Sequence, residues 1–216
     1  MRIIYTNSNI GKVGEVRRHF ARECFPIMDV FDPSIGVLDV EESGTTLGEN
    51  AKLKTEAYLG LLSHSREFSN SIVISDDTGL EIDALDGEPG IFVRRWKDGK
   101  TKMTDEEVIQ YTLERLDGTP YEKRGARFRT VVALGVLGEN GTRVGEVKLF
   151  EGVLKGRILE EPLQIREKGF PFFSLFFVDD YGVPLCDVYK CAGRGWSTHR
   201  ERAMDAVVRH LMMVRA

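Results

Sequence analysis

The most informative segment of the chain is Ile72-Val73-Ile74-Ser75-Asp76-Asp77-Thr78-Gly79-Leu80. Its apolar start predicts a buried strand that ends before the two acids, at the strand edge where α/β sheets bind ligands. Adjacent carboxylates repel each other, and a bound cation would relieve that repulsion. Oxygen donors without sulfur or imidazole favour Mg²⁺, with Mn²⁺ as the alternative. An Asx-turn that simply ends the strand explains the segment about equally well.

The bulk composition describes an ordinary globular chain. Its 216 residues are 42% hydrophobic and 30% charged, with a net charge of -4, so we expect a single domain over residues 1–216. The acidic balance argues against a protein that grips the nucleic acid backbone. No apolar run is long enough for a membrane helix, and no signal peptide precedes the first strand, so we expect a cytoplasmic protein. The three cysteines form no CxxC pair, which argues against a disulfide framework or a zinc site.

The order of expected elements favours an α/β fold. Strands without intervening helices between residues 127 and 178 require part of the sheet to be antiparallel. We therefore expect one domain of two lobes around a long mixed sheet, with a central substrate cleft. Strands are predicted at residues 2–5, 72–74, 127–137, 145–156 and 174–178, and helices at residues 12–21, 46–62, 104–116 and 198–213.

Two polar segments in the first quarter of the chain suit a phosphate ligand. Asn9 and Lys12 flank a predicted helix start, where free N–H groups attract anions and a lysine is unfavourable unless an anion is nearby. Asn50 and Lys54 lie one turn apart on the next helix, after the acids Glu41 and Glu42. An exposed lysine and a solvated helix flank are the simpler interpretations.

The third polar segment is Arg194-Gly195-Trp196-Ser197-Thr198-His199-Arg200. Arginine, histidine and hydroxyl groups at a helix start suit a phosphate or the edge of a purine base. Thr198 with Glu201 also has capping-box spacing, so Thr198 could be purely structural.

Taken together, these motifs resemble the inosine triphosphate pyrophosphatase family, which hydrolyses non-standard purine nucleoside triphosphates. The resemblance rests on motifs in order along the chain. They are Asn9-x-x-Lys12-x-x-Glu15, Glu49-Asn50-Ala51-x-x-Lys54, the long run from Asp76 to Gly90, Ala126-Arg127-Phe128, Phe150-Glu151-Gly152 with Gly156-Arg157-Ile158, and Thr198-His199-Arg200. It implies a two-lobed fold, a homodimer, and cleavage between the α- and β-phosphates to give a monophosphate and pyrophosphate.

The resemblance also implies a role for each matched residue. Asp77 and Lys54 would be catalytic. Glu42 and Asp77, with Asp76 beside them, would hold Mg²⁺ or orient the attacking water. Phe170 would stack on the base, and His199 and Arg200 would contact its edge. The residues implied to bind substrate are Asn9, Lys12, Asn50, Thr78, Phe170, Arg194, Thr198, His199 and Arg200.

Three departures from the family pattern lie in the part that recognises the base. Phe173 replaces the usual acid, Arg194 replaces a lysine and Thr198 replaces a serine. The metal and phosphate motifs are intact. We therefore expect hydrolysis to be retained and base preference to be shifted or relaxed. Hydrolysis of another modified or standard nucleotide, and nucleotide binding without catalysis, are the alternatives.

Overall fold

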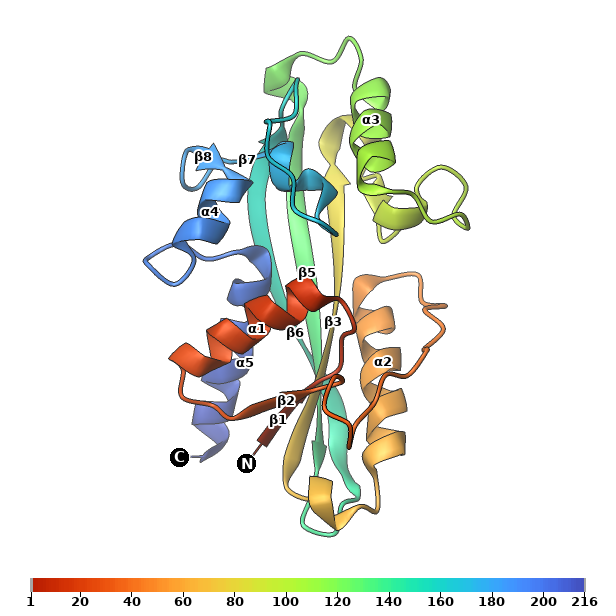
Figure 1. Cartoon of the computed structure of the whole chain (residues 1–216), viewed down its shortest axis with the longest axis vertical. Coiled ribbons are helices and arrows are strands. Elements are labelled where there is room, and N and C mark those ends of the chain that lie inside the picture. Colours follow the sequence, from red (N-terminus) through yellow and green to blue (C-terminus); the bar gives the residue numbers. More distant parts are fainter. Residues whose placement is uncertain (1, 216) are drawn as a thin grey trace. The chain divides into compact units, whose positions relative to one another are not determined.

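The computed structural model describes residues 2–215. Over that range an eight-stranded sheet has the order β2-β1-β3-β5-β6-β7-β8, with β4 paired to β3 (Figure 1). The strands are β1 (Arg2–Tyr5), β2 (Ile27–Asp29), β3 (Ser71–Ile82), β4 (Pro89–Gly90), β5 (Gly125–Leu137), β6 (Arg143–Ile158), β7 (Phe176–Val178) and β8 (Val183–Pro184). The α-helices are α1 (Ile10–Arg22), α2 (Leu47–Leu62), α3 (Asp105–Arg115), α4 (Leu185–Cys191) and α5 (His199–Arg215). None of these helices combines the length and hydropathy that a bilayer-spanning segment requires.

The sheet is mixed, which confirms the predicted α/β fold class. β1 pairs in parallel with both β2 and β3. β4 pairs antiparallel with β3, and β7 pairs antiparallel with both β6 and β8. The helix-free part of the sequence between β5 and β7 therefore includes antiparallel pairing, as its lack of crossover helices requires.

The chain forms two compact units. Unit 1 comprises Met1–Asp77, Thr130–Gly152 and Arg200–Ala216, and unit 2 comprises Thr78–Arg129 and Val153–His199. Strands β3, β5 and β6 each pass from one unit into the other along the chain. Each unit has its own hydrophobic core.

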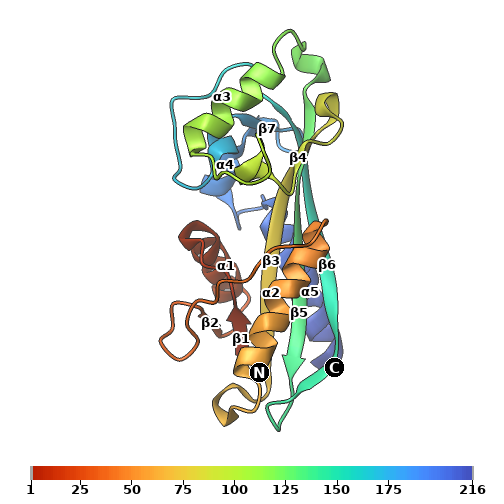
Figure 2. The same ribbon diagram turned by 90° about the vertical axis from the view of Figure 1, so that its right-hand side faces the viewer.

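In unit 1 the strands carry helices on both faces. Ile72 and Ile74 of β3 pack in one cluster with residues of α1 and α5, whereas Val73 between them packs in another with residues of α2. Successive strand residues point to opposite faces, so this alternation assigns α1 and α5 to one face and α2 to the other. Figure 1 shows the two helix groups on either side of the strands, and Figure 2 shows α2 lying along them.

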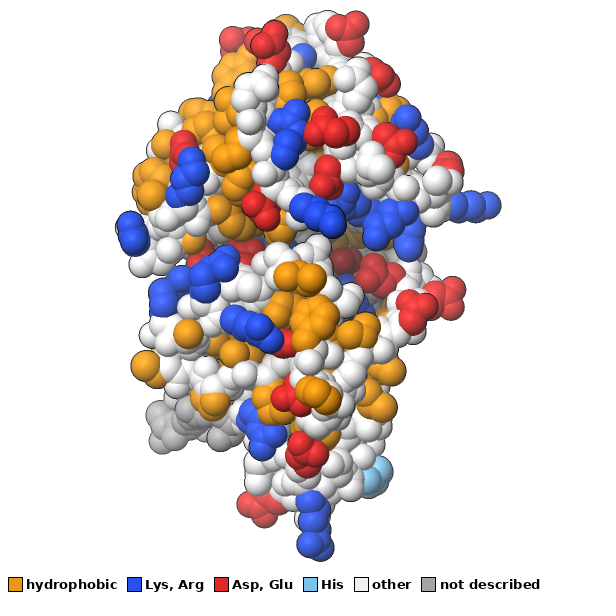
Figure 3. All heavy atoms as spheres, viewed as in Figure 1, with side chains coloured by type: hydrophobic (Ala, Val, Ile, Leu, Met, Phe, Trp, Pro, Cys, Tyr) orange, Lys and Arg blue, Asp and Glu red, His pale blue; other side chains and the backbone are white. Residues whose placement is uncertain are grey.

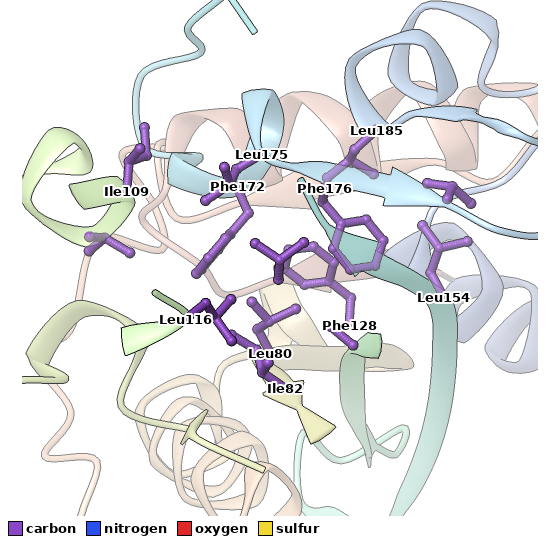
Figure 4. Packing of buried hydrophobic residues seen from close by; sticks show 14 of the residues in the cluster. Leu80, Ile82, Ile109, Leu116, Phe128, Leu154, Phe172, Leu175, Phe176 and Leu185 are labelled. Atoms are coloured by element: carbon purple, nitrogen blue, oxygen red, sulfur yellow. The ribbon is translucent and has the colours of Figure 1, made fainter. Parts of the chain in front are cut away.

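The core of unit 2 is rich in aromatic side chains. Phe128 of β5 packs edge-on against Phe172 and Phe176, with ring centroids 6.0 and 4.9 Å away. Figure 4 shows these rings beside Leu80 and Leu154, so β3, β5 and β6 all contribute to the cluster. A short 3₁₀-helix, η5 (Pro171–Ser174), brings Phe172 into this core.

Several predicted elements have their expected boundaries because the capping signals are strong. Thr46 with Glu49 starts α2 and Thr104 with Glu107 starts α3, each as a complete capping box. Asn9 caps α1 by accepting a hydrogen bond from the Lys12 amide, so this helix begins at Ile10, two residues before the predicted start. The capping residues therefore predict where these three helices begin.

The prediction that the strand ends at Ile74 is wrong. β3 continues through both acids to Ile82, so Asp76 and Asp77 lie within a strand. Ser174 belongs to η5 rather than to β7, and β2, β8 and α4 were not predicted. The longer strand matters because it sends the two acids to opposite faces.

Replacement of two glycines by alanine is expected to change the stability of the protein in opposite directions. In Gly156 of β6, a Cβ atom would lie 2.0 Å from the carbonyl oxygen of Phe177, so Gly156→Ala is expected to destabilise the protein by about 3 kcal/mol or more. In Gly60 of α2 a Cβ atom would meet nothing within 4 Å, so Gly60→Ala is expected to stabilise it by about 0.5–1 kcal/mol. Urea unfolding of both variants checks this pair; equal effects would contradict it.

A buried histidine predicts a pH dependence of stability. Burial lowers the pKa of His19 below its usual value, although Asp205 and Glu201 oppose the shift. The unfolded chain therefore binds the proton more readily, and stability is lost as pH falls through about 6.5. We expect the midpoint of urea unfolding to decrease between pH 7.5 and 5.5, and to decrease less in His19→Gln. An equal decrease in both proteins would exclude His19 as the cause.

Candidate active site

The two adjacent acids of β3 lie in different surroundings within unit 1. Asp76 contacts side chains from β1, α1 and α5, whereas Asp77 contacts side chains from α2. This separation follows from the strand geometry, because neighbouring residues of a strand point to opposite faces. Each acid therefore has its own set of direct contacts, while Lys12 and Lys54 each act on the charge of both carboxylates.

The Asp77 site contains a lysine between two carboxylates. Lys54 Nζ lies 3.1 Å from an oxygen of Glu42 and 3.5 Å from Oδ1 of Asp77. Asn50 Nδ2 donates to the other oxygen of Asp77 at 3.4 Å. Asn50 and Lys54 reach this place together because they are four residues apart on α2.

The loop that carries Glu42 is held against the start of α2. The backbone N–H of Gly44 donates to Oδ1 of Asn50 at 2.9 Å. A Cβ atom on Gly44 would lie 2.6 Å from that same oxygen, so only glycine allows this close approach. Asn50 thus joins the Glu42 loop to Asp77 through its two amide atoms.

Burial and charge shift the titration of the Asp77 site. Burial raises the pKa of Asp77, and the nearby carboxylates of Glu42 and Asp76 act in the same direction against the pull of two lysines. Burial alone would lower the pKa of Lys54, but the carboxylates outweigh it and the net pKa is raised. A carboxyl group with a raised pKa beside a fixed cation is suited to accepting a proton.

The Asp76 site is an ion-pair network. Oδ1 of Asp76 accepts hydrogen bonds from Tyr5 Oη and from Asn7 Nδ2, the latter at 3.0 Å. Oδ2 accepts from Lys12 Nζ at 3.1 Å and from Arg200 Nε at 3.3 Å. Burial would raise the pKa of Asp76, but the two cations and the hydrogen bonds overcome it and hold the pKa well below its usual value. Asp76 is therefore ionised, and its environment shifts its pKa in the direction opposite to that of Asp77.

Lys12 lies at the first turn of α1, as the sequence predicted. Asn9 is the N-cap of this helix, and its side-chain oxygen accepts from the Lys12 amide at 3.2 Å. Burial lowers the pKa of Lys12, and Asp76 partly offsets that effect. The lysine is thus held at a helix N-terminus, where the free N–H groups also favour an anion.

The donor set on the α2 face fits a magnesium ion that keeps some of its own ligands. Glu42 and Asp77 are both in contact with one ammonium group, so one cation can reach both carboxylates. Residues 2–215 contain no cluster of three or more acidic, histidine or cysteine ligands. Mg²⁺ is commonly bound by one or two carboxylates, with water and phosphate oxygens completing its shell. Asp76, predicted as a third ligand, contacts Lys12 and Arg200 through Oδ2, and its place in a metal site stays a prediction.

The predicted base-binding residues lie mainly in unit 2. Thr78 follows Asp77 directly in β3 and is half-buried. The ring of Phe170 is half-buried and packs edge-on to Tyr189 of α4 at 5.8 Å. Figure 3 shows apolar side chains gathered on the side of unit 2 that carries α4. The half-buried ring of Phe170 is of the kind on which a flat base can stack.

The remaining predicted residues differ in exposure. Arg194 is exposed in the loop after α4, and Thr198 is buried. His199 is also buried, and its ring stacks on Phe128 at 4.8 Å. Arg200 belongs to unit 1, where it contacts Asp76 and Glu15.

Sequence reasoning missed two members of the Asp76 network. Tyr5 ends β1, which pairs in parallel with β3, and Asn7 lies in the loop that follows. Their only signal was their place at the end of the neighbouring strand. Parallel strands present their carboxyl ends at one edge, so a polar residue after β1 could have been paired with the acids of β3.

The chain is similar to known proteins over almost its whole length. The profile of the Ham1 family matches residues 3–210. A dITP/XTP pyrophosphatase from Caldanaerobacter subterraneus subsp. tengcongensis is 36% identical over 205 residues, which cover 94% of this chain and 92% of that protein. A dITP/XTP pyrophosphatase from Listeria monocytogenes serovar 1/2a is 30% identical over 214 residues, covering 99% and 96%. The solved structure of the Staphylococcus aureus Ham1 protein is 31% identical, covers 98% of both chains and aligns with a TM-score of 0.73. This chain belongs to the Ham1 family.

Proposed function

We propose that the protein is a Mg²⁺-dependent pyrophosphatase of non-standard purine nucleoside triphosphates of the dITP and XTP type. The products are a nucleoside monophosphate and pyrophosphate, and the reaction removes such nucleotides from the cellular pool. The relatives called dITP/XTP pyrophosphatases support this assignment, because they match nearly the full chain. The geometry of unit 1 supports it independently.

The observation that carries the proposal is the Glu42–Lys54–Asp77 cluster. Hydrolysis of a triphosphate needs positive charge for the phosphate oxygens and a group that orients or deprotonates water. Lys54 supplies the charge, and the carboxylates of Glu42 and Asp77 would hold Mg²⁺ and orient or deprotonate the attacking water. Asn50 holds the carboxylate of Asp77 in place.

Glu42 and Asp77 are the residues that would hold Mg²⁺. The ion would neutralise charge on the phosphate oxygens when bound. Lys12 and Asn9, at the start of α1, would bind the phosphates together with Lys54. Thr78, Phe170, Arg194, Thr198 and His199 are proposed to contact the nucleoside part.

Phe173 favours a changed base preference. Its ring is buried and packs against Tyr189 at 5.5 Å, so the position offers no charged group to a base. A site that hydrogen-bonds a base edge discriminates far more strongly than an apolar site does. The enzyme is therefore proposed to accept a wider range of bases, including other modified or standard ones.

We also propose a homodimer in the cytoplasm. Exposed Met212, Met213 and Val214 at the end of α5 provide apolar surface for association. The three cysteines are free, as is usual for proteins of a reducing compartment. Light scattering of the purified protein measures the oligomeric state.

The proposed reaction is tested by product analysis. Purified protein with Mg²⁺ and ITP should release pyrophosphate and the monophosphate, and Mg²⁺ chelation should stop the release. Asp77→Asn should lower kcat by about 10²- to 10⁴-fold, because it removes one of the two carboxylates that would hold Mg²⁺ and orient or deprotonate the attacking water. Asp98→Asn, a change of an exposed turn carboxylate, serves as the control and should keep full activity. Release of inorganic phosphate alone, or full activity of Asp77→Asn, would contradict the proposal.

A panel of nucleotides tests the base preference. With ITP, XTP, dITP, dUTP, GTP and ATP, the kcat/KM values should fall within about 100-fold of one another, as expected for an apolar pocket. A preference for inosine and xanthosine nucleotides well beyond that range would show that discrimination between bases survives without an acid at position 173.

A further inference from the structure

Arg200 makes contacts that its predicted role at the base edge does not explain. Its Nε donates to Asp76 at 3.3 Å, and its Nη1 donates to Glu15 of α1. The side chain is 2% exposed, and those of Glu15 and Asp76 are 4% and 0% exposed. Arg200 thus joins α5, α1 and β3 within unit 1.

The backbone at Arg200 is firmly placed. It is the second residue of α5, whose Ala203, Met204 and Val207 are buried against the strands and α1 of unit 1. The guanidinium group is planar and rigid, so two contacts on fixed partners define its orientation. Glu15 and Asp76 are therefore held by a group that has little freedom to move.

Four charged side chains are joined by the ion pairs around Asp76. Lys12 and Arg200 contribute two positive charges, and Asp76 and Glu15 contribute two negative charges. Lys12 is the most exposed member, with 17% of its side chain accessible. It is the one charge of these four that can also meet a ligand from solvent.

We propose that Arg200 is a positioning residue for phosphate binding, acting through Asp76 on Lys12. Both cations share Oδ2 of Asp76, so Arg200 satisfies part of that negative charge and leaves the Lys12 ammonium able to bind a phosphate oxygen. Without Arg200, Oδ2 of Asp76 would lose one of the two cations that share it and would hold Lys12 more strongly, so phosphate would have to compete for the ammonium group. The inference rests on the phosphate-binding role of Lys12 in the proposed function.

The test uses the full-length protein and inorganic pyrophosphate, which has no base. Calorimetry in the presence of Mg²⁺ measures its Kd in the wild type, Arg200→Met, Arg200→Lys and Lys12→Met, and in the double variant Arg200→Met/Lys12→Met. Arg22→Met is the matched control, because Arg22 pairs with Glu201 between the same two helices but makes no contact with Asp76. Thermal unfolding shows which variants are folded.

Arg200→Met should weaken pyrophosphate binding by about 10- to 100-fold, the range usual for removing a side chain that orients a ligand-binding group. Arg200→Lys keeps the charge but not both contacts, so its loss should be smaller; this variant decides the question if Arg200→Met does not fold. Arg22→Met should bind as the wild type does. Adding Arg200→Met to Lys12→Met should cause little further loss, because both changes act on the same contact.

Three results would overturn the inference. Unchanged pyrophosphate binding in folded Arg200→Met and Arg200→Lys would exclude a positioning role. Losses that multiply in the double variant would show that Arg200 does not act through Lys12. An increase in the KM of Arg200→Met that depends on the base of the nucleotide, with pyrophosphate binding unchanged, would instead place Arg200 at the base edge.

The outcome is separable from that of the proposed function. A wild-type protein that binds pyrophosphate but hydrolyses no triphosphate would refute the pyrophosphatase proposal, while the Kd series would still decide the role of Arg200. A wild-type protein that does not bind pyrophosphate would overturn the inference itself, since there would be no phosphate site for Arg200 to support.

Discussion

The alternation of side chains along β3 is the constraint from which the site follows. Two acids joined by one peptide bond would repel each other on a single face, but a strand places Asp76 and Asp77 on opposite faces. Each then acquires its own partners. Cations and hydrogen bonds keep Asp76 ionised, whereas burial and neighbouring acids raise the pKa of Asp77. Environments that shift the pKa values of two carboxyl groups in opposite directions are typical of sites where one acid is structural and the other reacts.

The same alternation organises the helices of unit 1. Ile72, Ile74 and Asp76 face α1 and α5, and Val73 and Asp77 face α2. Each face therefore has apolar residues first and a charged residue beyond them, in register on both sides of the strand. The packed helices fix the backbone at Lys12 and Lys54, so the two lysines meet their acids without a separate supporting structure. The packing of the helices and the pairing of the lysines with the acids both follow from the alternation of side chains along β3.

The sequence predicted α1, α2, α3 and α5 but not α4, and it did not predict how the contacts of the two acids are divided. Capping boxes at Thr46 and Thr104 mark helix starts because they are local patterns. The spacing of Asn50 and Lys54 likewise places both on one helix face. The length of β3 was missed, because a polar pair after an apolar run reads as a turn when its partners are unknown. The partner of Asp76 in α5 lies 124 residues away, and no local pattern encodes such a pairing.

The order in which unit 1 is assembled follows from its composition of three chain segments. The first segment contains both lysines and both acids of the site, but α5, which covers one face of the strands and supplies Arg200, belongs to the last. During synthesis on the ribosome, the first segment of unit 1 is made early, but its core is complete only after the last segment has been made. Unit 2 ends at His199, so its segments are complete before α5 has been synthesised. Unit 1, which carries the reacting groups, is thus the first unit to be started and the last to be completed.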